Sequence, residues 1–138
     1  MTNTAWSHLP NAKHIDAVLA DVRKRTKAWD AAWNAARDAV RYVAQNEAWY
    51  AARNTAQNAE RNSAQNAAWD AAQNAAGDAA WYVAQDAVIV LIAWDSSADL
   101  LDCTPDVLRA MIDLAEPPVC HQAALLLPYA IVRFGTWP

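Results

Sequence analysis

A four-residue repeat runs without interruption through residues 29–88, almost half of the chain. Its second position holds Asp or Asn in 12 of the 15 tetrads, and its third and fourth positions together hold Ala in 22 of 30 cases. The first position is filled by Trp, Arg or Gln, and once by Gly. Ala, Gln and Arg are strong helix formers and β-branched residues are rare in the array, so the repeat predicts an all-α fold.

A period of four does not match the α-helix, which has about 3.6 residues per turn. Each tetrad therefore rotates the pattern by about 40° around the helix axis, and one straight helix through the array would present no constant face. Either the array breaks into shorter helices, or the helices wrap around one another with a right-handed sense. We favour breaks, near Asn54–Asn66, where Asn, Thr and Ser accumulate, and near Gly77.

A β-solenoid is the alternative architecture for such a repeat, because regular Asp and Asn columns can form ladders on stacked strands. Ala is depleted in strands and Val is nearly absent from the array, so helix is the better prediction. A longer duplication also aligns Trp29–Asn46 with Trp69–Asp86 at an offset of 40 residues. We expect equivalent helical segments to occur twice.

The array separates two less regular parts, and we expect all three to form one globular unit: an N-terminal amphipathic helix in residues 1–28, the array in 29–88 and a helical segment in 89–138. The first helix should run from Asn11, as N-cap, to about Lys27. Its apolar face follows the spacing i, i+3, i+4, i+7 and comprises Ile15, Val18, Leu19 and Val22. A basic cluster falls in its last turns, where cations complement the helix dipole.

The C-terminal part resembles ordinary globular sequence. Val88–Ile92 predicts a buried helix continuing out of the array or a short buried strand. Thr104-Pro105-Asp106 is a good helix start, with Thr as N-cap, Pro in the first position and an acid in the first turn. The apolar face expected after it consists of Val107, Leu108, Met111, Ile112 and Leu114. A last apolar segment, Val119–Val132, should be kinked or terminated at Pro128.

The cysteine content and the lengths of the apolar runs indicate in which cellular compartment the protein is expected. Two cysteines, Cys103 and Cys120, do not make a disulfide scaffold. The N-terminus lacks the apolar region of a signal peptide, and the longest strongly apolar stretch, Ala87–Trp94, is 8 residues, against the roughly 20 that a membrane span needs. We expect a cytoplasmic protein without membrane contact.

No residue pattern indicates catalysis, so we expect no enzyme and no cofactor. Two glycines cannot form a phosphate-binding loop. The spacing of the three histidines and two cysteines does not fit a structural zinc site, and a packed thiol is the simpler explanation. The acids Asp95, Asp99 and Asp102 would share one face of a continuing helix. Together with Asp106, these carboxylates could take part in acid–base catalysis or bind a metal. A solvated face and helix-start acids explain them more simply.

The charge is unevenly distributed. Residues 1–65 carry nine basic and six acidic side chains, whereas residues 66–138 carry two basic and nine acidic ones. Such a chain could associate head to tail, or offer its basic half to a polyanion such as nucleic acid. The candidate polyanion contacts are Arg23, Lys24, Arg25, Lys27, Arg37 and Arg41, interleaved with aromatic residues that could stack on bases. The acidic net charge of −4 makes nucleic-acid binding the second hypothesis.

The tryptophans of the first repeat position are the candidate interaction residues. They are Trp29, Trp33, Trp49, Trp69 and Trp81. Buried, they would be core or inter-helix packing; exposed, they would indicate a protein partner or self-assembly, because aromatic residues are enriched at interface hot spots. The two interpretations differ only in where the rings face.

Three stretches together carry a family resemblance: residues 6–16 (WSHLPNAKHID), the Ala-Trp-Asx array, and the tail with Leu91–Asp95, Leu100–Asp102 and Leu125–Pro128. Over nearly its whole length the chain resembles small uncharacterised proteins of tailed bacteriophages and prophages. The resemblance implies a phage-encoded protein acting in the bacterial host cell and brings no activity with it. We therefore predict a non-enzymatic protein that binds a host protein or another copy of itself.

Overall fold

The computed structural model describes residues 6–7, 9–39, 47–51 and 62–135, and every regular element in these ranges is helical. The all-α prediction is confirmed, and the β-solenoid alternative is not supported. The labelled elements are α1 (Ala12–Lys24), α2 (Thr26–Ala39), α4 (Asn62–Ala76), α5 (Asp78–Ala93), the 3₁₀ helix η1 (Asp95–Leu100), α6 (Pro105–Leu114) and α7 (Val119–Phe134). A short helical turn at residues 47–51 lies between α2 and α4 and carries no label.

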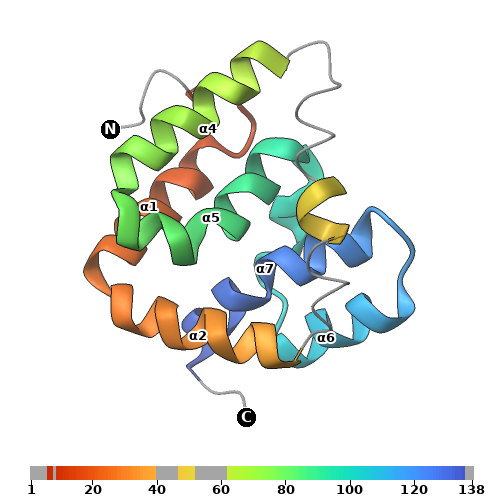
Figure 1. Cartoon of the computed structure of the whole chain (residues 1–138). Helices are drawn as coiled ribbons and strands as arrows, with labels where there is room; N and C mark the ends of the chain where they lie inside the picture. The colour runs from red at the N-terminus through yellow and green to blue at the C-terminus, as the bar shows by residue number, and fades with distance from the viewer. Residues whose placement is uncertain (1–5, 8, 40–46, 52–61, 136–138) are drawn as a thin grey trace.

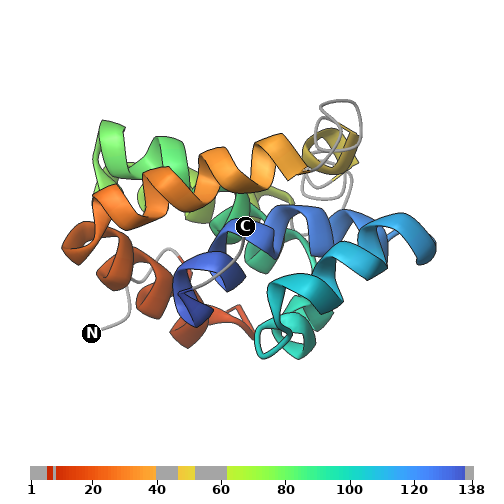
Figure 2. The ribbon, with the colours of Figure 1, turned by 90° about the horizontal axis from the view of Figure 1, so that it is seen from below.

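Helix α5 lies at the centre of the bundle, where it contacts α1, α2, α4, α7 and η1 (Figure 1). Helix α7 crosses the other side of the core, with α2 on one flank and α6 on the other (Figure 2). Both helices are buried over most of their length, and their largest fully buried side chains include Ile89, Leu91, Ile92 and Leu125–Leu127. Most of the large aliphatic side chains of the core thus come from the end of the array and the sequence after it, and they are joined by α1 and by Trp29.

The N-terminal helix forms with the predicted apolar face: Ile15, Val18, Leu19 and Val22 are all buried. It ends at Lys24, earlier than predicted, because the chain breaks at Arg25 and a second helix begins at Thr26. The Thr26 hydroxyl donates a hydrogen bond of 2.7 Å to the carbonyl of Val22 across this break. Lys27 therefore lies in the first turn of α2 and not in the last turn of α1.

The fourth position of the repeat faces the core in each described helix of the array. Among the described tetrads it is buried at 32, 36, 48, 68, 72, 80, 84 and 88, and half-buried at 76. The second position faces solvent in every described tetrad except the last, where Asp86 is buried. The Asp and Asn column is therefore an outer surface, and the alanine column is the inner one.

The other two columns show the rotation of about 40° per tetrad that a period of four requires. Along α2 the first position passes from buried Trp29 through half-buried Trp33 to exposed Arg37. The same rotation carries the third position from solvent into the core: along α5 it passes from exposed Ala79 to buried Val83 and Ala87. The fourth column stays central because each helix ends before the rotation carries it out of the core.

A break between helices turns the fourth repeat position back toward the core, as predicted at Gly77. Helix α4 ends at Ala76, and Gly77 turns the chain with φ 82° and ψ 161°, a conformation essentially restricted to glycine. The second predicted break, near Asn54–Asn66, lies mostly outside the described residues, and α4 begins within it at Asn62. The 40-residue duplication is not equivalent in structure, since α2 continues through Arg37 whereas its counterpart Gly77 separates two helices.

The C-terminal predictions are confirmed at the start of α6 and partly wrong elsewhere. Thr104 caps α6 by accepting a hydrogen bond of 3.3 Å from the Val107 amide, and Pro105 follows in the first turn. Val88–Ile92 continues the array as helix, and Val119–Phe134 continues through Pro128 as one helix. Termination at Pro128 is therefore wrong. The apolar face predicted for α6 is only half used, because Leu108 is buried whereas Val107 and Leu114 are exposed.

Side chains from distant elements satisfy the carbonyls at three helix ends, where backbone acceptors lack intrahelical partners. The buried Asn11 amide donates to the carbonyls of Leu91 and Trp94, at 3.0 and 3.1 Å, at the end of α5. Asn11 precedes α1 as predicted, but its side chain does not cap that helix. The Arg23 guanidinium donates two bonds, of 3.1 and 2.8 Å, to the carbonyl of Ala75 near the end of α4. The Arg133 guanidinium donates one hydrogen bond of 2.8 Å to the carbonyl of Leu101, just after η1.

Candidate interaction surface

The five candidate tryptophans divide into buried and half-buried groups. Trp29 and Trp81 belong to the core, with 0% and 6% of their surface exposed. The half-buried members are Trp33, Trp49 and Trp69. Packing therefore accounts for Trp29 and Trp81, and only the half-buried rings present an edge to a partner.

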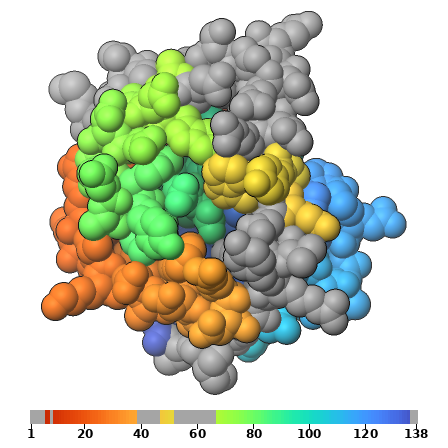
Figure 3. All heavy atoms as spheres, viewed as in Figure 1, coloured from red at the N-terminus to blue at the C-terminus, as the bar shows by residue number. Residues whose placement is uncertain are grey.

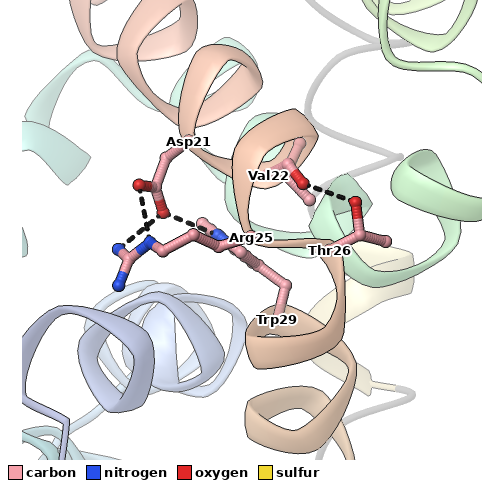
Figure 4. Close-up of polar contacts among 5 residues, drawn as sticks. All are labelled: Asp21, Val22, Arg25, Thr26 and Trp29. Carbon is pink, nitrogen blue, oxygen red and sulfur yellow. Dashed lines mark hydrogen bonds and ion pairs between the residues drawn. The ribbon is translucent and has the colours of Figure 1, made fainter.

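Trp29 anchors the junction between α1 and α2 (Figure 4). Its ring lies 5.9 Å from that of Tyr129, and its indole NH donates a hydrogen bond of 2.8 Å to the Asp21 carboxylate. The same carboxylate accepts two hydrogen bonds from the Arg25 guanidinium, at 3.0 and 2.8 Å. Burial by itself would raise the pKa of Asp21, but the hydrogen bonds from Arg25 and Trp29 and the charges of Arg25 and Lys24 outweigh it and lower that pKa. The junction is a structural contact and leaves Trp29 no outward face.

Trp49 and Trp69 form a separate aromatic contact between the turn at residues 47–51 and α4. Their ring centroids lie 6.1 Å apart in an edge-to-face arrangement, and the Trp49 ring meets Tyr50 in the same way at 5.5 Å. This is the preferred geometry for an aromatic pair. Tyr50 is the exposed member, with 60% of its surface accessible.

A second accessible aromatic pair consists of Trp33 on α2 and Tyr82 on α5. The ring centroids are 5.0 Å apart, and Tyr82 has 53% of its surface exposed. The Arg37 guanidinium lies 5.3 Å from the centre of the Trp33 ring, within the range of a cation–π contact. A cation, an indole and a phenol thus form one continuous surface.

The two exposed tyrosines are not among the residues predicted to contact a protein partner, for which the sequence indicated the tryptophan column. Tyr50 and Tyr82 occupy the second repeat position, where nearly all other tetrads have Asp or Asn. That column is the outer one, so an aromatic residue placed in it is displayed to solvent. The departure from the polar consensus was the signal in the sequence. The third such residue, Tyr42, lies outside the described residues.

A hollow of about 360 Å³ lies beside this pair, between α2 and the first turns of α5. Its lining residues are Thr26, Lys27, Asp30, Ala79, Tyr82 and Val83. The orange surface of α2 and the green surface at the start of α5 border one another on this face (Figure 3). The hollow, together with Trp33 and Arg37, is called the α2–α5 groove below. It offers apolar walls with charged residues at the rim, as binding sites on proteins commonly do.

Several of the candidate polyanion contacts are engaged within the fold. Arg23 binds the end of α4, Arg25 pairs with Asp21, and Arg37 lies over Trp33. Lys24 and Lys27 are exposed, and Arg41 lies outside the described residues. Three of the five described cations therefore already make contacts within the fold.

The remaining candidates for chemistry are dispersed. Helix α5 ends at Ala93 and Trp94 is extended, so the prediction that Asp95, Asp99 and Asp102 share a face of a continuing helix is wrong. Asp102 instead pairs with Arg133 at 2.7 Å. Across the described ranges no three His, Cys, Asp or Glu side chains cluster as metal ligands would, and Cys103 and Cys120 are both free thiols. His8 lies outside those ranges.

Neither a membrane span in the described part of the chain nor a known relative identifies the class of protein. No helix among the described residues is long and apolar enough to cross a bilayer. Comparison of the chain with family models, with curated proteins and with solved structures finds no match. The resemblance to phage proteins stays a prediction.

Proposed function

We propose that the protein acts by binding another protein through the α2–α5 groove, and that it performs no catalysis. The observation that carries the proposal is Tyr82, an aromatic residue in the outward-facing repeat position that lies against Trp33 at the edge of a hollow. Exposed aromatic residues with an adjacent cation are typical of interface hot spots, in which Trp, Tyr and Arg are enriched. The repeat then serves as a scaffold that fixes these side chains in place.

The groove defines the chemistry of its partner. The Ala79 and Val83 side chains give the hollow an apolar wall that suits an aliphatic or aromatic side chain. Lys27 in the lining of the hollow and Arg37 over the Trp33 ring suit carboxylates beside that side chain. Asp30, which also lines the hollow, would repel those carboxylates and so restrict the orientation of the partner. We infer a partner segment with a protruding apolar residue flanked by acids. In line with the phage resemblance, the proposed site of action is the bacterial cytoplasm, with a host protein or a second copy as partner.

Nucleic-acid binding through residues 23–61 is the second hypothesis, and the geometry gives it less support. Electrostatic binding to phosphates needs cations that can leave their present contacts. Arg23 and Arg25 are engaged within the fold, and Arg23 closes the end of α4. A gel-shift assay at low and moderate salt decides this point: a salt-dependent shift would support the second hypothesis.

Site-specific photocrosslinking tests the proposal. A benzophenone amino acid replaces Tyr82 or, as the matched control in the same outward-facing column, Asn74 on α4. On irradiation in bacterial cells, we expect a discrete protein crosslink from position 82 and none from position 74. The added substitution Ala79→Glu, which fills the hollow, should abolish the crosslink. A crosslink of equal yield from both positions, or one that survives Ala79→Glu, contradicts the proposal.

A further inference from the structure

Helix α6 carries an apolar stripe that nothing in the described fold covers. Val107, Ala110 and Leu114 follow one another at i, i+3 and i+7 and are all exposed. Leu114 has 83% of its surface accessible, more than any other large apolar side chain among the described residues. The residues that α6 buries are Pro105 and, on another side of the helix from the stripe, Leu108.

Acidic residues border the stripe. Asp106 and Asp113 are exposed, lie seven residues apart and therefore fall on the same edge of the helix. Asp113 has an ion pair of 3.7 Å with Arg109 and remains 62% exposed. Pairing two copies of this face would bring the acidic edges together in an antiparallel arrangement, which like charges disfavour. The occupant must instead supply cations next to an apolar hollow.

We propose that the occupant is a second copy of this chain, whose α2–α5 groove receives Leu114 of the first in a head-to-tail contact. This inference depends on the proposed function and names the partner of that same groove. The α6 stripe is a protruding apolar residue flanked by acids. The groove combines a hollow of about 360 Å³, lined by Lys27 and by one acid, Asp30, with Arg37 beside it over the Trp33 ring. The basic half of the chain, residues 1–65, contains α2, and the acidic half, residues 66–138, contains α6, so these two helices belong to halves of opposite charge.

The two surfaces cannot meet within one molecule, because α2 and α6 lie on opposite flanks of α7 (Figure 2). A contact between unlike faces of identical chains gives a closed ring or an open chain of subunits. One helix stripe against one groove is small beside the ~1,600 Å² that a stable interface buries. We therefore expect association that depends on protein concentration.

Complementary variants test this contact. Leu114→Lys removes the protruding residue, and Ala79→Glu fills the hollow and adds an acid at the exposed start of α5, where the helix dipole favours it. Their matched controls are Ala20→Lys on the exposed side of α1 and Ala28→Glu in the first turn of α2, neither of which lines the groove or the stripe. Circular dichroism checks that each variant folds.

In sedimentation velocity over a concentration series, the wild type and both controls should associate, and each test variant alone should remain monomeric. An equimolar mixture of the two test variants should give a dimer that does not grow further, because one supplies an intact Leu114 and the other an intact groove. A monomeric wild type, self-association of Ala79→Glu, or a monomeric mixture overturns the head-to-tail contact. If the wild type is monomeric while Tyr82 still gives its specific crosslink, the inference fails and the proposed function stands.

Discussion

The repeat helices and the C-terminal helices contribute different things to one bundle. Helix α4 buries Ala68 and Ala72, and helix α2 buries two alanines alongside Trp29. Buried alanine removes little apolar surface from water but lets backbones approach closely. Helices α5 and α7 bury Ile, Val and Leu on nearly all sides. Most of the large aliphatic side chains buried among the described residues therefore lie on α5 and α7, whereas the second repeat position displays its side chains to solvent, as at Tyr82 on α5 itself. Buried and displayed side chains thus occupy different positions of the repeat, and this difference can be tested.

The largest effect should come from truncating the C-terminal core. Leu126→Ala removes a fully buried side chain from α7, and we expect the free energy of unfolding to fall by about 2–5 kcal/mol. Leu114→Ala makes the same chemical change at an exposed position of α6 and should alter it by less than about 0.5 kcal/mol. Urea denaturation of dilute protein measures both. Equal losses would contradict this difference between buried and displayed side chains.

The next largest effect should come from Gly77, which restores the phase of the repeat between α4 and α5. No atom lies within 4 Å of a Cβ added there, so Gly77→Ala costs only backbone strain, about 1–3 kcal/mol. Gly135, with φ 74° and ψ −5°, also has an open surround and lies in the milder left-handed helical region. Gly135→Ala should therefore cost less, about 1–2 kcal/mol. Thermal unfolding that ranks the two variants in the reverse order would refute this role of Gly77.

A similar loss should follow from enlarging the inner column of the array. Ala72 is fully buried, so Ala72→Leu overpacks the contact and should cost about 1–3 kcal/mol. Asn74→Leu introduces the same side chain two residues later, in the outward-facing column, and should be within about 0.5 kcal/mol of the wild type. Chemical denaturation compares them. If Asn74→Leu proves the more damaging, the assignment of inner and outer columns is wrong.

The smallest effect concerns the junction at Asp21, whose pKa is lowered in the folded state. Its carboxylate stabilises the fold above the unfolded-state pKa of about 3.9, and this contribution is lost as pH falls through the lower folded-state value. Asp21→Asn should cost less than about 1 kcal/mol at pH 7, since the pair is partly exposed. The difference from wild type should shrink as the pH falls from about 4 to 2. A difference that grows with acid would reverse the sign of the shift.

The sequence was sufficient for the architecture of the array because one geometric fact governs it. A helical repeat of period four has to be interrupted or wrapped to keep one face inward, and the break predicted at Gly77 follows from glycine being the residue that tolerates φ 82°. The apolar face of α1 was equally readable, because Ile15, Val18, Leu19 and Val22 are spaced for burial. Local periodicity fixes which face of a helix is apolar.

Local periodicity does not predict contacts between residues that are distant in the sequence. The buried Asn11 amide was predicted to cap its own helix, whereas it serves the end of α5, 80 residues away. The exposure of Leu114 was missed because α6 packs with only part of its apolar face. The importance of Tyr82 follows from which repeat column faces outward, and the repeat has no intrinsic inside or outside until the C-terminal helices provide a core.

Side-chain labelling tests the central claim most directly, namely that the array displays Tyr82 for a protein partner while it buries Trp29. Hydroxyl-radical footprinting compares the two residues in dilute isolated protein and in the complex with the partner recovered by crosslinking at position 82. We expect Tyr82 to be oxidised readily in the isolated protein and protected in the complex, with Trp29 protected in both. Oxidation of Tyr82 to the same extent in both states would contradict the account.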